Sequence, residues 1–305
     1  MTKNFFKKMI EYLFYFFIFL LPWQTRLILR EGLLNDGAWE WGMYSLYLTD
    51  IIFILLVTLF CFNFLIRPLI SKQTLNLEAQ FQNKIHRSRA IKDKFSMSAK
   101  IFFLILFFLI FAFLSIFWAK SFGLAFYWWL RLFQGVVLFF LIQKINFSFI
   151  KASLSLILAG FLQFVLAGYQ FFEQQVFGSK WLGIAAQDSS QSGVSVIETI
   201  NGRFLRVYGS FSHPNIFAGF IVLLIFVSFY LYFQLKKTWQ KLFILFFGMI
   251  GAIVLFLTYS RAAWLALIVG VVFLGFSIFK NSEINFRCRF IEFFGLISII
   301  VIIFC

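Results

Sequence analysis

The chain has 305 residues, of which 62% are hydrophobic, and its mean hydropathy is +0.92. This composition excludes a soluble domain, and apolar runs of about 20 residues match the length that a helix needs to cross a bilayer. The net charge of +15 does not indicate nucleic-acid binding, because the basic residues lie between the apolar runs, where they orient a membrane protein.

Polar breaks between apolar segments predict an all-α, polytopic bundle of about nine transmembrane helices. The predicted spans are near residues 9–22, 46–66, 101–118, 123–142, 153–172, 214–234, 242–259, 262–279 and 290–305. The first follows three lysines and has no small-residue cleavage site, so we interpret it as an uncleaved anchor rather than a signal peptide. The last is still apolar at Cys305, which favours a chain truncated at its C-terminal end.

The distribution of basic residues predicts a cytoplasmic N-terminus. With that orientation, 19 of the 27 lysines and arginines fall in cytoplasmic segments and seven fall outside. The longest cytoplasmic segment, 67–100, is basic and predicts a loop or surface helix against anionic inner-leaflet lipids. The longest outward segment, 173–213, is rich in Gln, Ser and Gly and is a candidate lid or substrate-binding loop.

Two arginine motifs lie at the outward ends of predicted spans: R-V-Y-G-S-F-S-H-P-N at 206–215 and T-Y-S-R at 258–261. Pro214 predicts a helix start that Ser212 or His213 can cap. Each arginine alone can extend to lipid headgroups. Two arginines that converge beside helix N-termini would instead hold a phosphate or pyrophosphate.

The two motifs, in this order and with this spacing, resemble those of the O-antigen ligase and O-antigen polymerase superfamily of bacterial envelope glycosyltransferases. In that family an R-x-x-G-x-F-x-x-P-N pattern enters one helix, and an S-R pair ends the next outward-going helix. The resemblance covers motifs within 200–279 and, in topology, the whole chain. It implies an N-terminal transmembrane region, 1–199, and a ligase/polymerase-like core, 200–305.

The resemblance implies a multi-pass enzyme of the bacterial plasma membrane that works on its extracytoplasmic face. Such an enzyme transfers a glycan from undecaprenyl diphosphate to a glycan, lipid or protein acceptor, without a metal or other cofactor. Arg206 and Arg261 match the family's arginines, which hold the diphosphate and stabilise it as a leaving group. The other candidate substrate-binding residues are Arg203, His213, Asn215, Ser260 and Arg131.

The chain departs from the family in its histidines. Family members carry a later outward loop with a histidine proposed to activate the acceptor hydroxyl, and neither His86 nor His213 occupies that position. If the chain ended at Cys305, His213 would be the candidate base on the outward side. Structural roles are the alternative for His213, Asn215 and Arg203.

Arg131 has two interpretations because it follows two tryptophans inside a predicted span. It can pair with a buried acid such as Asp50 or Glu173, or it can make a third contact to the lipid diphosphate or glycan. The widely spaced Cys61, Cys288 and Cys305, a set that includes no C-x-x-C pair, predict neither a disulfide framework nor a metal site.

Two other classes of function remain open at this stage. A transporter or flippase for an anionic or lipid-linked substrate could line its path with the same arginines, although no paired inverted repeats are evident. An inactive fragment or a structural membrane subunit is the other alternative.

Overall fold

The computed structural model describes residues 2–34, 37–38, 42–71, 99–200, 202–281 and 284–304. The chain is mostly helical, and six helices in the described part are long and apolar enough to cross a membrane. These spans are Ile101–Trp118, Phe122–Lys144, Phe149–Glu173, Pro214–Gln234, Thr238–Leu257 and Arg261–Lys280. The chain is therefore a multi-pass helical membrane protein.

The six helices coincide with six of the predicted spans, but the predicted number of nine is not confirmed. The three other predicted spans fall on α1 (Thr2–Leu20), α2 (Leu48–Ser71) and α10 (Ile284–Phe304). These are helices, yet within the described residues they do not belong to the set that is long and apolar enough to span. Residues 72–98 of the predicted basic segment, with His86, lie outside the described residues.

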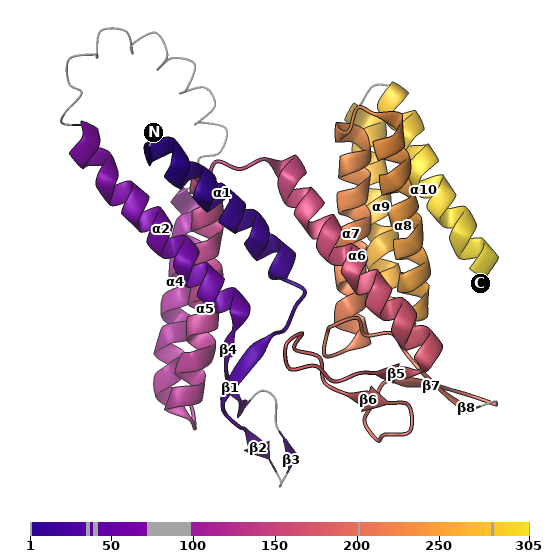
Figure 1. Ribbon diagram of the computed structural model, residues 1–305, viewed down its shortest axis with the longest axis horizontal. Helices are drawn as coiled ribbons and strands as arrows, with labels where there is room; N and C mark the ends of the chain where they lie inside the picture. The colour runs from indigo at the N-terminus through magenta and orange to yellow at the C-terminus, as the bar shows by residue number, and fades with distance from the viewer. Residues whose placement is uncertain are drawn as a thin grey trace. The chain divides into compact units, whose positions relative to one another are not determined.

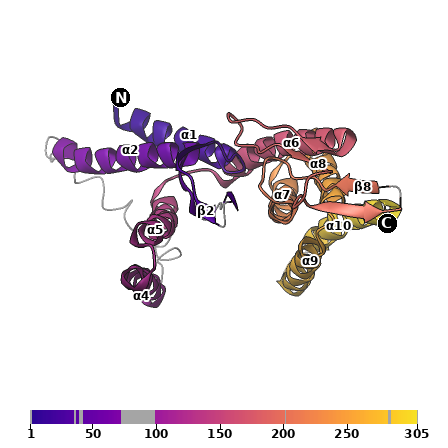
Figure 2. The same cartoon turned by 90° about the horizontal axis from the view of Figure 1, so that it is seen from below.

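The chain divides into two compact units, and the first contains residues 1–14, 27–46 and 50–147. Its helices are the start of α1, α2, α4 (Ala99–Leu114), the short 3₁₀ helix η4 (Ser115–Trp118) and α5 (Phe122–Lys144). Figure 2 shows α4 and α5 nearly end-on as a neighbouring pair, and their facing side chains include the edge-to-face rings of Phe113 and Trp129. Short strands precede α2: β1 (Arg26–Arg30) pairs with β4 (Tyr44–Tyr47), and β2 (Leu33–Leu34) pairs with β3 (Gly37–Ala38).

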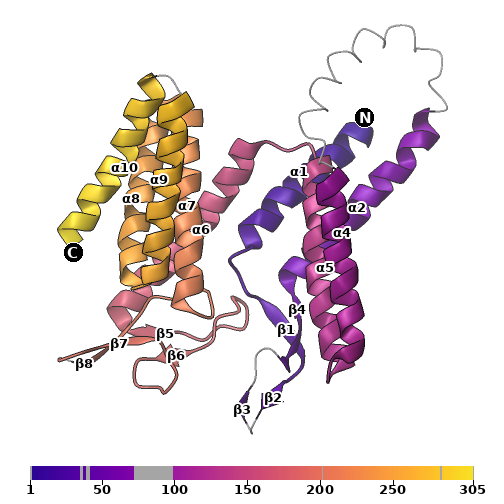
Figure 3. The same ribbon diagram turned by 180° about the vertical axis from the view of Figure 1, so that it is seen from behind.

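The second unit contains residues 15–26, 47–49 and 148–305. In it, α7 (Pro214–Gln234) and α8 (Thr238–Leu257) form an antiparallel pair, flanked by α6 (Phe149–Glu173), α9 (Arg261–Asn281) and α10 (Figures 1 and 3). Fully buried side chains follow one another at helical spacing along α7, from Phe217 through Ile221 to Leu224. Gly160 of α6 leaves room for the side chain of Leu224 in α7, since a Cβ there would lie 2.4 Å from Cδ1 of that leucine.

The predicted outward loop 173–213 contains structure of its own. Two antiparallel hairpins form there, β5 (Gln175–Val176) with β6 (Gln187–Asp188) and β7 (Val196–Thr199) with β8 (Gly202–Leu205). They lie at the end of the second unit where α6 finishes and α7 begins (Figure 1). Their small apolar cluster consists of Val176, Ile184, Leu205 and Tyr208. The loop is therefore a folded cap on one end of the helices.

Candidate functional site

The two predicted arginines line one cleft of about 510 Å³ in the second unit. Arg206 comes from the segment after β8, and Arg261 is the first residue of α9. The other residues that line the cleft are Val196, Ile197, Phe256, Tyr259 and Trp264. None of these lining residues is acidic, so the cleft combines two positive charges with apolar and aromatic walls.

Arg206 is held by the backbone and by one amide. Its Nε–H donates to the carbonyl oxygen of Thr258 at 2.7 Å, and its Nη2–H donates to Oδ1 of Asn215 at 2.7 Å. Burial lowers the pKa of Arg206 below its ordinary value, although a guanidinium remains charged in proteins. Because two of its five N–H donors are used in this way, the group is oriented and retains donors for a ligand.

The turn between α8 and α9 positions Arg261. Tyr259 adopts a left-handed backbone with φ of 50°, and its N–H donates to the carbonyl of Phe256 at 2.9 Å. Ser260 is buried and its backbone carbonyl accepts the N–H of Trp264 at 3.2 Å, so the helix starts directly at the arginine. The first N–H groups of a helix lack intrahelical acceptors and carry the positive end of its dipole, which adds to the arginine's charge.

Two buried glutamines of α6 fix the backbone that follows Arg206. Oε1 of Gln170 accepts the N–H groups of Tyr208 and Gly209 at 2.8 and 2.9 Å, and Nε2 of the same side chain donates to the Gly209 carbonyl at 2.7 Å. Oε1 of Gln163 accepts the N–H of Ser210 at 2.8 Å. A loop buried against a helix needs such partners, since unsatisfied backbone groups are costly there.

Gly209 is required at its place in this loop. Its φ is +58°, a left-handed conformation that side chains with a Cβ rarely adopt, and an added Cβ would lie 2.7 Å from Oε1 of Gln163. Backbone bonds to α6 thus hold the Y-G-S part of the first motif, and the ring of Phe211 stacks on Phe217 of α7.

His213 caps α7, as one of the two alternatives from sequence predicted. Its Nδ1 accepts the N–H of Asn215 at 3.1 Å, and its Nε2 lies 3.2 Å from Oγ of Ser195. A neutral imidazole with an accepting Nδ1 carries its proton on Nε2, which therefore donates to Ser195. Burial first, and then the charge of Arg206, lower the pKa of His213 below its ordinary value of 6.5.

The remaining candidates of the second unit differ in their relation to the cleft. Asn215 bonds Arg206 directly, and Ser260 precedes Arg261 but is not among the lining residues. Arg203 lies on β8, where its Nη1 donates to the Ser190 carbonyl at 3.3 Å and its Nε is 3.9 Å from the exposed Glu198. The structure therefore brings Asn215 to the site and leaves Arg203 on the hairpin surface.

Arg131 belongs to the first unit, where it pairs with Asp50, one of the two acids considered from sequence. Its Nη2 donates to the Ser45 carbonyl at 2.6 Å and to the Tyr127 hydroxyl at 2.9 Å. Gln134 accepts from Nη1 at 3.3 Å and donates to the same Asp50 carboxylate. These bonds join α5 to the beginning of α2, which is a sufficient structural reason for an arginine inside a span.

Sequence reasoning missed the two glutamines and the aromatic walls. Gln163 and Gln170 are seven residues apart inside an apolar span, which places them on one face of a helix, and this spacing was the available signal. No comparable signal marks Phe256 or Trp264 among the many aromatic residues of the chain.

No protein-family model, curated protein or solved structure matches this chain. Within the described residues, no three His, Cys, Asp or Glu side chains lie together as a metal site would require.

Proposed function

We propose that this protein is a glycosyltransferase that moves a glycan from undecaprenyl diphosphate to an acceptor hydroxyl on the outer face of the bacterial plasma membrane. The observation that carries the proposal is the meeting of Arg206 and Arg261, from motifs about 50 positions apart, in one cleft without an acidic lining residue. The motifs' resemblance to O-antigen ligases and polymerases supplies the reaction class.

The chemistry assigned to the arginines is stabilisation of the leaving group. When the acceptor oxygen attacks C1 of the first sugar, the C1–O bond to the diphosphate breaks, and its electron pair remains on the phosphate oxygen. Arg206, oriented by Thr258 and Asn215, and Arg261, at the positive end of α9, are placed to bind that growing charge. Preplaced donors stabilise it with little reorganisation, and the acceptor's proton passes to a water molecule, which acts as the base.

His213 is not assigned as that base in our proposal. Its Nδ1 lone pair is used by the N–H of Asn215, and its Nε2 carries the proton that faces Ser195. To accept a proton it would have to give up the cap of α7. We assign it the structural role of fixing Asn215, which in turn orients Arg206.

The walls of the cleft suit the same substrate. Phe256, Tyr259 and Trp264 offer flat apolar surface beside the two charges, and sugar rings and a prenyl chain both have apolar faces that can pack there. A cleft that binds only a small free anion would have no need of three aromatic walls.

A proteoliposome assay tests the proposal. The purified full chain is given a polyprenyl diphosphate that carries a fluorescent sugar, together with an envelope acceptor fraction, and covalent transfer and release of the lipid diphosphate are followed. We expect both products in equal amounts. Movement of the labelled lipid across the bilayer without covalent transfer would instead identify a flippase and overturn the assignment.

A further inference from the structure

A second cavity, remote in sequence from both arginine motifs, lies in the first unit. It has a volume of about 350 Å³, within the usual range of ligand pockets. Its lining residues are Lys7, Lys8, Ile10, Glu11, Phe60, Asn63, Lys144, Ile145 and Asn146. The set contains three lysines and one glutamate, so the cavity carries a positive charge, and the two asparagines add neutral donors.

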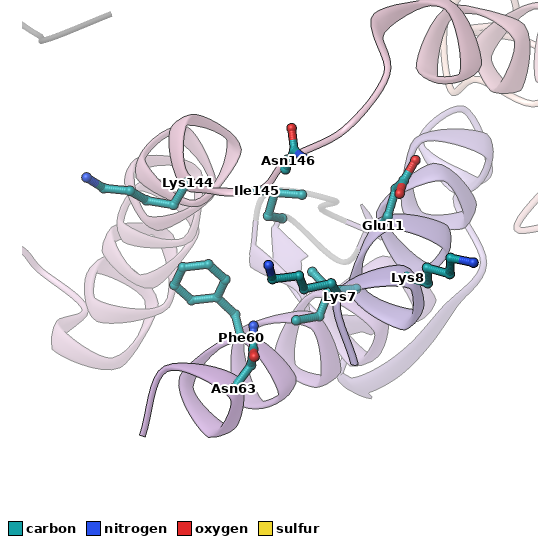
Figure 4. A pocket seen from close by; sticks show the side chains of 9 residues that line it. Lys7, Lys8, Glu11, Phe60, Asn63, Lys144, Ile145 and Asn146 are labelled. Carbon is teal, nitrogen blue, oxygen red and sulfur yellow. The ribbon is translucent and has the colours of Figure 1, made fainter. Parts of the chain in front are cut away.

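The cavity is amphipathic. Ile10 and Ile145 are buried and, with Phe60, form an apolar floor, whereas the lysines are exposed at the rim. Figure 4 shows the Lys7 side chain extending from α1 toward Phe60 and Asn63 of α2. Lys8 and Lys144 extend outward at opposite edges in the same view, and their flexible stems leave their ammonium groups able to turn toward a ligand.

One edge of the cavity also lies where a candidate membrane span ends, which is where lipid headgroups would lie. Lys144 is the last residue of the membrane-spanning helix α5, and Ile145 and Asn146 follow immediately, so the rim begins where the span ends. A phosphate at this level meets the lysines, while the first carbons of an acyl chain can lie against the apolar floor. A soluble anion would leave that floor exposed to water.

We propose that this cavity binds the headgroup of an anionic phospholipid, with its phosphate at Lys7, Lys8 and Lys144 and its glycerol region against Phe60, Ile10 and Ile145. The lysines supply charge, and Asn63 and Asn146 supply hydrogen bonds to phosphate or headgroup oxygens. The site is independent of the arginine cleft and does not rest on the proposed transferase activity.

Native mass spectrometry of the detergent-purified full chain tests the proposal, with phosphatidylglycerol as the anionic lipid and phosphatidylcholine as the neutral one. The test variant is Lys7→Gln/Lys8→Gln/Lys144→Gln. The matched control, Lys236→Gln/Lys237→Gln/Lys241→Gln, removes three lysines from the α7–α8 region of the other unit. Since one basic residue near an anionic surface contributes roughly a fivefold change in binding, we expect at least about a tenfold loss of phosphatidylglycerol in the test variant alone.

Three outcomes would overturn the proposal. Equal losses in both triple variants would mean that only the overall surface charge matters. Unchanged phosphatidylglycerol binding in the test variant would show that the cavity does not bind the lipid. Displacement of the bound lipid by millimolar inorganic phosphate in the wild type but not in the test variant would make a soluble phosphate the ligand.

A single substitution provides a second test of the lipid site if the triple variant does not fold. Asn146→Asp adds one negative charge to the rim at nearly constant size, and we expect it to weaken phosphatidylglycerol binding roughly fivefold without changing phosphatidylcholine binding. An equal change for both lipids would contradict a headgroup site.

Discussion

The Nε–H of Arg206 donates to the backbone carbonyl of Thr258 across 2.7 Å, although the two residues lie 52 positions apart. The carbonyl belongs to the end of α8, one turn before Arg261. The bond therefore ties the first arginine motif to the second, and the relative position of the two guanidinium groups depends on it.

Replacing either arginine of the cleft by lysine should reduce transfer activity. An ammonium is a point charge that cannot reproduce the planar fork of donors, and at position 206 it would also lose the paired bonds to Thr258 and Asn215. We expect Arg206→Lys and Arg261→Lys each to reduce transfer by roughly 100-fold, the loss typical of one removed transition-state donor. Arg289→Lys on α10 makes the same chemical change away from the cleft and should keep full activity. Full activity in both cleft variants would show that the two arginines have no role in the reaction.

Acid should destabilise the protein through His213. Because its pKa is lowered in the folded chain, the unfolded chain binds a proton first as pH falls below 6.5, and the free energy of unfolding then decreases until the folded form also titrates. Above that pH both forms are neutral and this contribution is complete. Thermal unfolding in detergent should therefore show a lower midpoint at pH 5.5 than at 7.5.

The variant His213→Asn isolates this effect, since asparagine also caps helices but does not titrate. Its unfolding midpoint should depend less on pH across the same interval. An identical pH dependence in the wild type and the variant would contradict the assignment of the effect to this histidine.

Gln170→Leu should destabilise the second unit. The substitution leaves the N–H groups of Tyr208 and Gly209 and one carbonyl without their partners, and each unsatisfied buried group costs about 1–3 kcal/mol. We expect a loss of at least about 2 kcal/mol in the free energy of unfolding, measured by denaturant titration in micelles. Gln234→Leu, at the exposed end of α7, is the control and should change little. Equal effects of the two substitutions would show that the buried bonds contribute nothing.

Gly209→Ala should be harmful where Gly219→Ala is not. A Cβ at position 209 meets Oε1 of Gln163 at 2.7 Å in a left-handed conformation that costs roughly 1–2 kcal/mol, whereas a Cβ at position 219 of α7 meets nothing within 4 Å. We expect a lower unfolding midpoint and lower activity for the first variant only. A midpoint at the wild-type value for Gly209→Ala would show that the loop tolerates a different backbone.

The spans could be predicted from sequence where apolar runs are long and uninterrupted. The segment that becomes α7 has no charged residue from Pro214 to Gln234, and its predicted limits are those of the structure. The predicted spans 9–22 and 290–305 fall on α1 and α10, which are helices but are not, within the described residues, among those long and apolar enough to cross a membrane.

The site could be predicted only in part. The chemistry of arginine at a membrane surface and the motif resemblance selected Arg206 and Arg261, and both line the cleft. Nothing in the local sequence of Val196 and Ile197 shows that they form its wall, since this depends on the pairing of β7 with β8 and on the placement of that hairpin.

At Tyr259, the residue that would relieve backbone strain differs from the residue that forms a wall of the cleft. A glycine would adopt its φ of 50° without the roughly 1–2 kcal/mol that a side chain costs there, so Tyr259→Gly is locally a relaxing change. The same change would remove an aromatic side chain from the cleft and make the backbone at residues 259 and 260, directly before Arg261, more flexible. Selection for thermal stability alone would thus favour variants that lack the aromatic side chain at position 259. A laboratory search for more stable variants should therefore exclude this position from mutagenesis.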